Sequence, residues 1–120
     1  MTKRELIEYC LTYPASYEDY PFDKTAAVMR HSGNKKMFAL IGVRQGKLYI
    51  NLKCDPTESV FLRDIYESIT PGWHMNKEHW NTVYPDGDVP EQTLYDMIGH
   101  SYDLIKPKEK KGKKDKKSRE

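Results

Sequence analysis

The histidines and cysteines are the first residues in this sequence whose types could do chemistry, because both are common zinc ligands. They are His31, His74, His79, His100, Cys10 and Cys54. No CxxC, HxxxH or HExxH pattern is present, so the spacings that usually bring two ligands to one metal ion are missing. His74 and His79, five residues apart, would lie on opposite faces of an extended segment. The sequence therefore predicts no metal site and no cofactor.

The nucleophilic side chains give no better indication of catalysis. Cys54 lies at the end of a strand-like run, with no base placed beside it in the sequence. Ser32, Ser59 and Ser68 lack the glycines of a nucleophile elbow. Cys10 and Cys54 are far apart, and we expect both to be reduced and compatible with a core. We therefore expect that the protein is not an enzyme.

Six basic side chains form the most informative polar group. They come from three neighbouring strand-like runs and their turns, and are Arg30, Lys35, Lys36, Arg44, Lys47 and Lys53. If one sheet face gathered them, Tyr49 and Asn51 would lie among them and the face would suit phosphate contacts. The alternative is an ordinary solvated sheet face whose charges keep its edges from aggregating. The six residues are thus a candidate nucleic-acid-binding surface.

The elements that must position this surface are three strands, at residues 25–31, 37–44 and 47–53, joined by short turns. In the third run Leu48, Ile50 and Leu52 alternate with polar residues. That alternation predicts one buried face and one solvent-exposed, partly basic face.

Helices and two shorter extended segments complete the pattern. The first helix begins after Thr2 and ends before Pro14, and the third begins near residue 90. The second begins at Asp55, and its expected apolar stripe is Val60, Phe61, Ile65 and Ile69. Short extended segments are expected at residues 73–75 and 79–84, and the stretch 14–23 is expected to be an ordered loop.

The resulting order, α-β-β-β-α-β-β-α, predicts an α+β fold of two layers. An antiparallel sheet of about five strands carries the helices on one face. The residues expected to be buried together are Leu48, Ile50, Leu52, Phe61, Ile65, Leu94 and Ile98.

Charge divides the chain into a domain at 1–105 and a tail at 106–120. The tail has nine Lys/Arg and three Asp/Glu, giving +6, and the first 105 residues have eleven and fifteen, giving −4. The tail's lysine-rich run from 106 to 117 has no apolar residue to bury, so we expect disorder. The amino terminus has no apolar run of signal-peptide or membrane-span length, and a cytoplasmic protein is expected.

The segment 71–83, Pro-Gly-Trp-His-Met-Asn-Lys-Glu-His-Trp-Asn-Thr-Val, resembles the signature of the MmcQ/YjbR family of small bacterial proteins. A tyrosine-rich loop at 17–22, the 52–56 junction and the carboxy-terminal helix also resemble it. The motif residues are Trp73, His74, Asn76, Lys77, His79 and Trp80. The resemblance implies a two-layer fold similar to type III secretion chaperone-like and double-wing proteins, with DNA binding by analogy. On that analogy Lys77 is a wing-tip residue, and otherwise it lies in a solvated turn.

Trp73 and Trp80 have two candidate roles, packing in the core or presenting an aromatic surface. In an extended segment Trp80 and Thr82 would face one way, and Asn81 and Val83 the other.

The function that these observations favour is non-enzymatic nucleic-acid binding by a monomer, with DNA as the expected ligand. The phosphate contacts would come from the solvent-exposed sheet face and hairpin turns, aided by the basic tail. The main alternative is a protein-interaction adaptor resembling secretion-type chaperones, with the loop 13–22 and the same sheet face holding a peptide. A third hypothesis is that the protein is an enzyme or small-molecule binder that uses the 73–80 segment.

Overall fold

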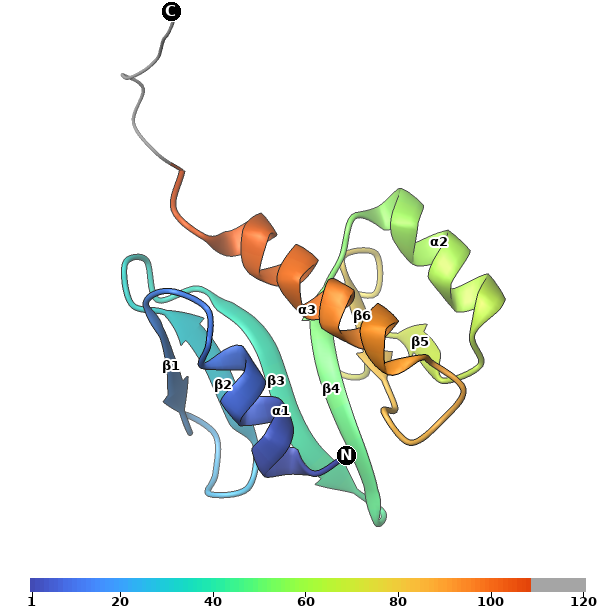
Figure 1. Cartoon of the computed structure of the whole chain (residues 1–120), viewed down its shortest axis with the longest axis horizontal. Coiled ribbons are helices and arrows are strands. Elements are labelled where there is room, and N and C mark those ends of the chain that lie inside the picture. Colours follow the sequence, from blue (N-terminus) through green and yellow to red (C-terminus); the bar gives the residue numbers. More distant parts are fainter. Residues whose placement is uncertain (109–120) are drawn as a thin grey trace, which may run out of the picture.

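A computed structural model describes residues 1–108 of the 120-residue chain (Figure 1). In chain order the elements are α1 (Lys3–Cys10), β1 (Ser16–Asp19), β2 (Ala27–His31), β3 (Met37–Arg44), β4 (Lys47–Lys53), α2 (Pro56–Ile65), β5 (Ile69–Pro71), β6 (Trp80–Val83) and α3 (Glu91–Ile105). The strands form one antiparallel sheet in the order β1-β2-β3-β4-β6-β5. The α+β fold is confirmed, with six strands rather than about five.

The helices pack on one face of this sheet, and Figure 1 shows α1 and α3 lying across it. As the alternation predicts, Leu48, Ile50 and Leu52 of β4 are buried there, together with Leu94 and Ile98 of α3. The helices add Leu6, Ile7 and Cys10 from α1 and Leu62 from α2. We call the opposite side of the sheet the second sheet face.

The first helix begins where the sequence places it because its amino-terminal end is capped. The Thr2 hydroxyl accepts a hydrogen bond from the Glu5 amide at 3.1 Å, and the Glu5 carboxylate accepts one from the Thr2 amide at 2.8 Å. This reciprocal pair satisfies two amides that the helix cannot satisfy itself.

The second helix turns a different side to the sheet from the one expected. Phe61 and Ile65 are 62% and 61% exposed, so the prediction that both are buried is wrong. The inward side carries Ser59 and Leu62 instead. Ser59 accepts a hydrogen bond from the Asn81 side chain at 3.2 Å, and polar contacts of this kind fix the helix rotation against the apolar pattern.

Two strand boundaries also differ from the expectation. Residues 16–19, expected to be loop, form edge strand β1, which pairs with β2 through polar and half-buried positions. The strand expected at 73–75 lies earlier, at Ile69–Pro71, and 73–79 is a series of turns. Consequently Ile69 belongs to β5 and not to the stripe of α2.

Within residues 1–108, no helix is long and apolar enough to cross a membrane. Cys10 and Cys54 are both free thiols and both buried, as expected.

Candidate nucleic-acid interface and the pocket on the second sheet face

Two of the six candidate lysines and arginines lie beside the start of the carboxy-terminal tail. Lys35 and Lys36 belong to the β2–β3 turn, and the Asn34 side-chain amide in that turn donates a hydrogen bond to the Ile105 carbonyl at 2.7 Å. A Cβ placed on Gly33 would lie 3.2 Å from the Pro107 ring. The turn therefore contacts the end of α3. We call the group Lys35, Lys36, Lys106 and Lys108 the basic end.

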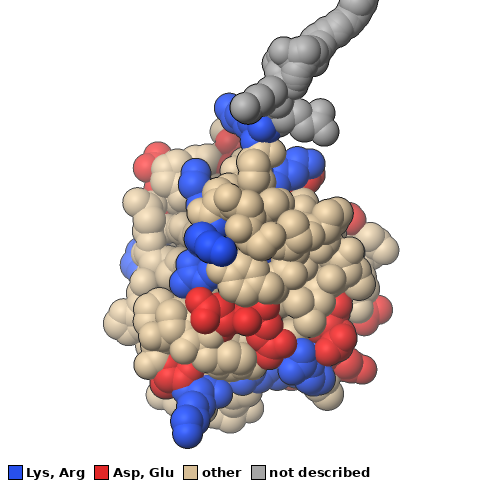
Figure 2. Space-filling view, turned by 90° about the vertical axis from the view of Figure 1, so that its left-hand side faces the viewer, with Lys and Arg blue, Asp and Glu red and all other residues tan. Residues whose placement is uncertain are grey.

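Figure 2 faces this side of the molecule and shows basic side chains beside the origin of the tail, with some acidic side chains among them and a larger acidic group farther away. The Lys35 ammonium nitrogen lies 5.6 Å from the centre of the Tyr17 ring, and its backbone has a positive φ of 64°. Lys106 forms an ion pair with Asp103 at 3.0 Å. These contacts fix the position of the β2–β3 turn, and the positive charge of its lysines lies near the start of the tail.

The two candidate arginines are engaged within the protein. Arg30 donates to the Asp19 carboxylate at 2.9 Å and to the Lys35 carbonyl at 2.8 Å. Arg44 stacks its guanidinium 4.0 Å from the Trp73 ring centre and donates to the Tyr84 hydroxyl at 2.9 Å. Arg30 therefore supports the β2–β3 turn, whereas Arg44 supports the second sheet face.

The remaining candidate lysines are spread over the molecule. Lys47 pairs with Arg44 at the far end of β3 from Lys36, roughly 26 Å away at about 3.3 Å per residue. Lys53 is half-buried at the other end of β4. Lys77 donates its side-chain hydrogen bond to the Gly72 carbonyl at 2.8 Å. The structure brings Arg30, Lys35 and Lys36 together. Lys53 lies at the same end of the sheet, beside Phe38, whereas Arg44 and Lys47 are paired at the opposite end.

The second sheet face is not the solvent-exposed surface that the alternation predicts. Tyr49 is 7% exposed and Asn51 2% exposed, so neither can interleave with phosphate-binding lysines as expected. Tyr49 packs with Val28 and Leu40 in a second, smaller apolar cluster. The face is covered at this point by the 73–75 segment, which the sequence pattern does not place there.

A pocket of about 420 Å³ opens on this face between the sheet and two loops. Leu40, Tyr49 and Asn51 line it from the strands, and Phe22, Trp73 and Met75 line it from the loops. Aromatic rings and thioethers predominate, as in many small-molecule sites.

The motif segment 73–80 is a compact turn that is tied to β6. The Asn76 side chain accepts hydrogen bonds from the amides of Glu78 at 2.9 Å and His79 at 3.2 Å. The His74 ring packs edge-on against Trp73, with 4.2 Å between ring centres. Trp73 is 37% exposed and Trp80 half-buried, so both tryptophans have one side against the protein and one toward solvent.

Arg63 is the anchor of this segment that sequence reasoning misses. Its guanidinium donates to the Asn81 side chain at 2.7 Å and to the carbonyls of Lys77 and Trp80. These bonds hold the motif segment against α2. The only trace of these bonds in the sequence is one arginine on α2. The apolar spacing of that helix indicates an ordinary amphipathic helix and gives no sign of the bonds.

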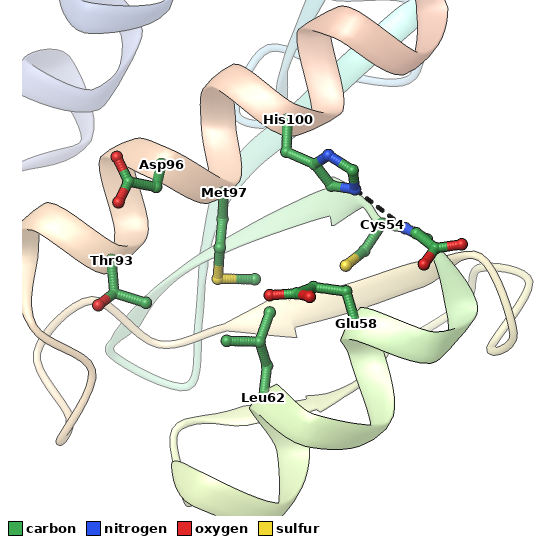
Figure 3. A pocket seen from close by; sticks show the side chains of 8 residues that line it. Cys54, Glu58, Leu62, Thr93, Asp96, Met97 and His100 are labelled. Carbon is green, nitrogen blue, oxygen red and sulfur yellow. Dashed lines mark hydrogen bonds between the residues drawn. The ribbon is translucent and has the colours of Figure 1, made fainter.

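A second pocket, of about 360 Å³, lies between α2 and α3 (Figure 3). Cys54 and Glu58 face Met97 and His100 across it. The His100 Nε2 atom accepts a hydrogen bond from the Asp55 amide at 3.2 Å. Burial raises the pKa of the Cys54 thiol, so Cys54 is protonated at neutral pH and is no activated nucleophile.

Neither this pocket nor the histidines of the motif form a metal centre. Across residues 1–108, no three His, Cys, Asp or Glu side chains form a group that could hold a metal ion. His74 and His79 lie in a series of turns and not in an extended segment. The argument that they point to opposite faces of a strand therefore does not apply.

Comparisons with known proteins agree with this geometry. The model of the YjbR family matches residues 11–104. YyaQ of Bacillus subtilis is 35% identical over 118 residues, covering 88% of this chain and 99% of its own. YbdF of Escherichia coli O157:H7 is 42% identical over 86 residues, covering 72% and 69%, and YjbR of E. coli K12 is 30% identical over 102 residues, covering 85% of each. All three are described as uncharacterized proteins, so they supply no activity.

Solved structures share the fold. The crystal structure of Deinococcus radiodurans protein DR2400, a DUF419 domain, has a TM-score of 0.79 and 37% identity, covering 87% of this chain and 78% of its own. A crystal structure from Pseudomonas syringae has a TM-score of 0.77 and 31% identity, covering 88% and 100%.

Proposed function

The chain belongs to the YjbR family, and from that premise we propose that it is a non-enzymatic nucleic-acid-binding protein, with DNA as the expected ligand, that contacts phosphates through the basic end. The observation that carries the proposal is the bond between Asn34 and the Ile105 carbonyl, which holds the turn of Lys35 and Lys36 beside the origin of the tail. The tail adds nine Lys/Arg against three Asp/Glu. Positive charge is concentrated there although residues 1–105 are net acidic.

The expected mode of binding is electrostatic and indifferent to sequence. Lysines at a turn and in a tail reach phosphates, and release of counterions from DNA then drives association. The second sheet face supplies none of these phosphate contacts, because Tyr49 and Asn51 are buried in it. A cytoplasmic monomer is part of the proposal.

The test removes two charges from the full-length chain and measures binding to duplex and single-stranded DNA by fluorescence anisotropy. We expect K35Q/K36Q to weaken binding and to reduce the slope of log K against log salt by about 0.9 for each duplex phosphate that is no longer neutralised. The matched control is K24Q/K47Q, which removes the same charge from exposed lysines at the other end of the sheet. The control should bind like the wild type. Equal weakening by both pairs would mean that only net charge matters, and would contradict the assignment to the basic end.

A protein-interaction adaptor is the second candidate, and one observation favours it. Val60, Phe61 and Ile65 form an exposed apolar side of α2, with exposed fractions of 66%, 62% and 61%. Large apolar side chains clustered on a surface often mark a protein interface. The expectation that the loop 13–22 holds a peptide has less support, because Tyr13 packs on Phe38 and Tyr102.

The adaptor is tested with partners captured by the full-length protein. A partner that F61Q/I65Q no longer binds and K35Q/K36Q retains would support the adaptor. A partner that both variants retain would count against it.

A further inference from the structure

The pocket on the second sheet face has features that the proposed phosphate contacts do not use. Its volume of about 420 Å³ falls in the range of about 300–1,000 Å³ that is usual for small-molecule sites. It lies over the middle strands of the sheet, whereas the basic end lies at the β2–β3 turn. A ligand of this pocket would therefore contact residues other than the four lysines of the basic end.

Tyr49 is a buried residue that lines this pocket, and its hydroxyl oxygen lies against Gly42. Tyr49 is only 7% exposed, and its hydroxyl makes no hydrogen bond to any residue in the 1–108 region. The ring lies across Gly42, where an added Cβ would come within 2.9 Å of the hydroxyl oxygen. Burial raises the pKa of this phenol, so it remains a neutral donor. A hydroxyl on a buried residue is unfavourable without a partner, and a ligand atom would satisfy it.

The Trp73 wall is held in place before any ligand binds. The Trp73 amide donates to the Thr82 hydroxyl at 2.8 Å, and that hydroxyl donates to the Asn51 side chain at 2.6 Å. Arg44 stacks on the indole with 4.0 Å to its ring centre. Because the backbone and the ring are both fixed, an aromatic ligand that contacts the part of the indole left free by Arg44 and His74 would cost little side-chain freedom.

Asp23 is an exposed residue that adds a negative charge to the lining of the pocket. One of its carboxylate oxygens accepts hydrogen bonds from the amides of Ala26 at 2.9 Å and Thr25 at 2.7 Å. These bonds lower the pKa of Asp23, so the carboxylate is ionised at neutral pH. A negative charge in the wall disfavours anionic ligands and offers an acceptor to an N–H donor.

We propose that this pocket binds a planar, uncharged heteroaromatic ring that carries an N–H donor, such as a purine base. The ring stacks against Trp73 and Phe22, the Tyr49 hydroxyl bonds a ring nitrogen or oxygen, and Asp23 accepts from the N–H group. Met37 and Met75 adjust to the outline of the ring, since unbranched thioether chains adapt to different shapes. The ring could belong to a free compound or to a base in single-stranded nucleic acid.

The experiment titrates adenine into full-length, 15N-labelled protein and follows the indole N–H signals by NMR. We expect the Trp73 signal to shift and the Trp80 signal to stay, and benzoate, an anion of similar flatness, to shift neither. Y49F should weaken adenine binding about tenfold, the cost of removing one hydrogen bond. Its matched control is Y95F on α3, which should bind adenine as the wild type does.

A second variant covers the case in which Y49F disturbs the fold. A26L adds volume at a position that lines the pocket and should also reduce binding. Titration with oligo(dA) identifies the source of the ring. If the Trp73 signal shifts at a lower concentration of bases in oligo(dA) than of free adenine, the ring is a base in nucleic acid. If free adenine shifts the signal at the lower concentration, the ring belongs to a free compound. A Trp73 signal that neither ligand moves, or an adenine affinity that Y49F and A26L leave unchanged, would overturn the proposal.

Discussion

Arg63 links helix α2 to the 77–81 segment, which is distant from it in sequence. Its partners are the Asn81 side chain and two carbonyls in the 77–80 segment. Asn81 is completely buried, and its amide group also donates to Ser59. A buried polar network of this kind is favourable only while every member has a partner.

Replacing Arg63 with alanine should therefore destabilise the fold. We expect R63A to lower the free energy of unfolding by about 2–3 kcal/mol, because the Asn81 oxygen would remain buried without its donor. Urea denaturation measures this. R4A is the control, since the Arg4 side chain is 55% exposed and forms surface ion pairs with Glu8 and Glu18, and it should change stability little. A loss for R63A below about 0.5 kcal/mol would show that the network does not hold the segment.

Asp88 gives the fold a dependence on acid pH. Its carboxylate accepts hydrogen bonds from Ser68 and from the Glu67 amide, and these bonds lower its pKa. Its contribution is therefore complete above the unfolded-state pKa of about 4 and is lost as pH falls toward the lowered folded-state value. We expect the stability difference between wild type and D88A to be largest near pH 6 and to shrink below about pH 4. Urea denaturation across that range checks this, and a constant difference would contradict it.

At the level of elements, the sequence predicts those whose pattern depends on local spacing. The alternation of Leu48, Ile50 and Leu52 identifies β4 and its buried side, because period-two spacing leaves one choice of face. The short edge strand β1 has no apolar alternation, so the pattern does not reveal it. In α2 the spacing of apolar residues cannot show that polar bonds from Ser59 and Arg63 set the rotation.

The same limit applies to the candidate site. The turn lysines Lys35 and Lys36 can be assigned from the hairpin pattern, since the turn lies between two clear strands. The pocket cannot, because Phe22 and Trp73 line it together with Tyr49 from loops far away in the chain. Contacts between distant segments leave no periodic signal.

The rotation of α2 can be tested by substitution. L62A should cost about 2–4 kcal/mol, since Leu62 packs in the core. F61Q and I65Q should each change stability by less than about 0.5 kcal/mol, since both side chains are in solvent. Thermal or urea unfolding gives the three values. A large loss of stability in F61Q or I65Q would indicate that these side chains are buried, as the apolar spacing predicts, and would contradict the observed rotation of α2.

In the whole molecule, the apolar core that stabilises the fold and the excess of positive charge lie in different parts of the chain. Residues 1–105 hold the apolar core and are net acidic, whereas the basic excess lies in 106–120. The predicted disorder of the tail concerns residues that lie mostly outside the described region, 109–120. The two parts meet at the β2–β3 turn, where Gly33 lies against Pro107.

Truncation after Lys108 separates the two parts while keeping that contact. Residues 109–120 contain no apolar side chain to contribute to a core, so the thermal midpoint should stay within a few degrees of the full-length value. Affinity for DNA at low salt should fall steeply, together with the salt slope, because six lysines and one arginine leave the chain with the segment.

The binding that remains after this truncation decides whether the folded part contributes. We expect weak residual binding that K35Q/K36Q abolishes in the 1–108 chain and that K24Q/K47Q preserves, since the basic end keeps its turn in that chain. Fluorescence anisotropy at low salt measures all three proteins. If residues 1–108 show no binding, the tail alone attracts DNA through counterion release, and the folded domain is better assigned to protein interaction through the exposed side of α2.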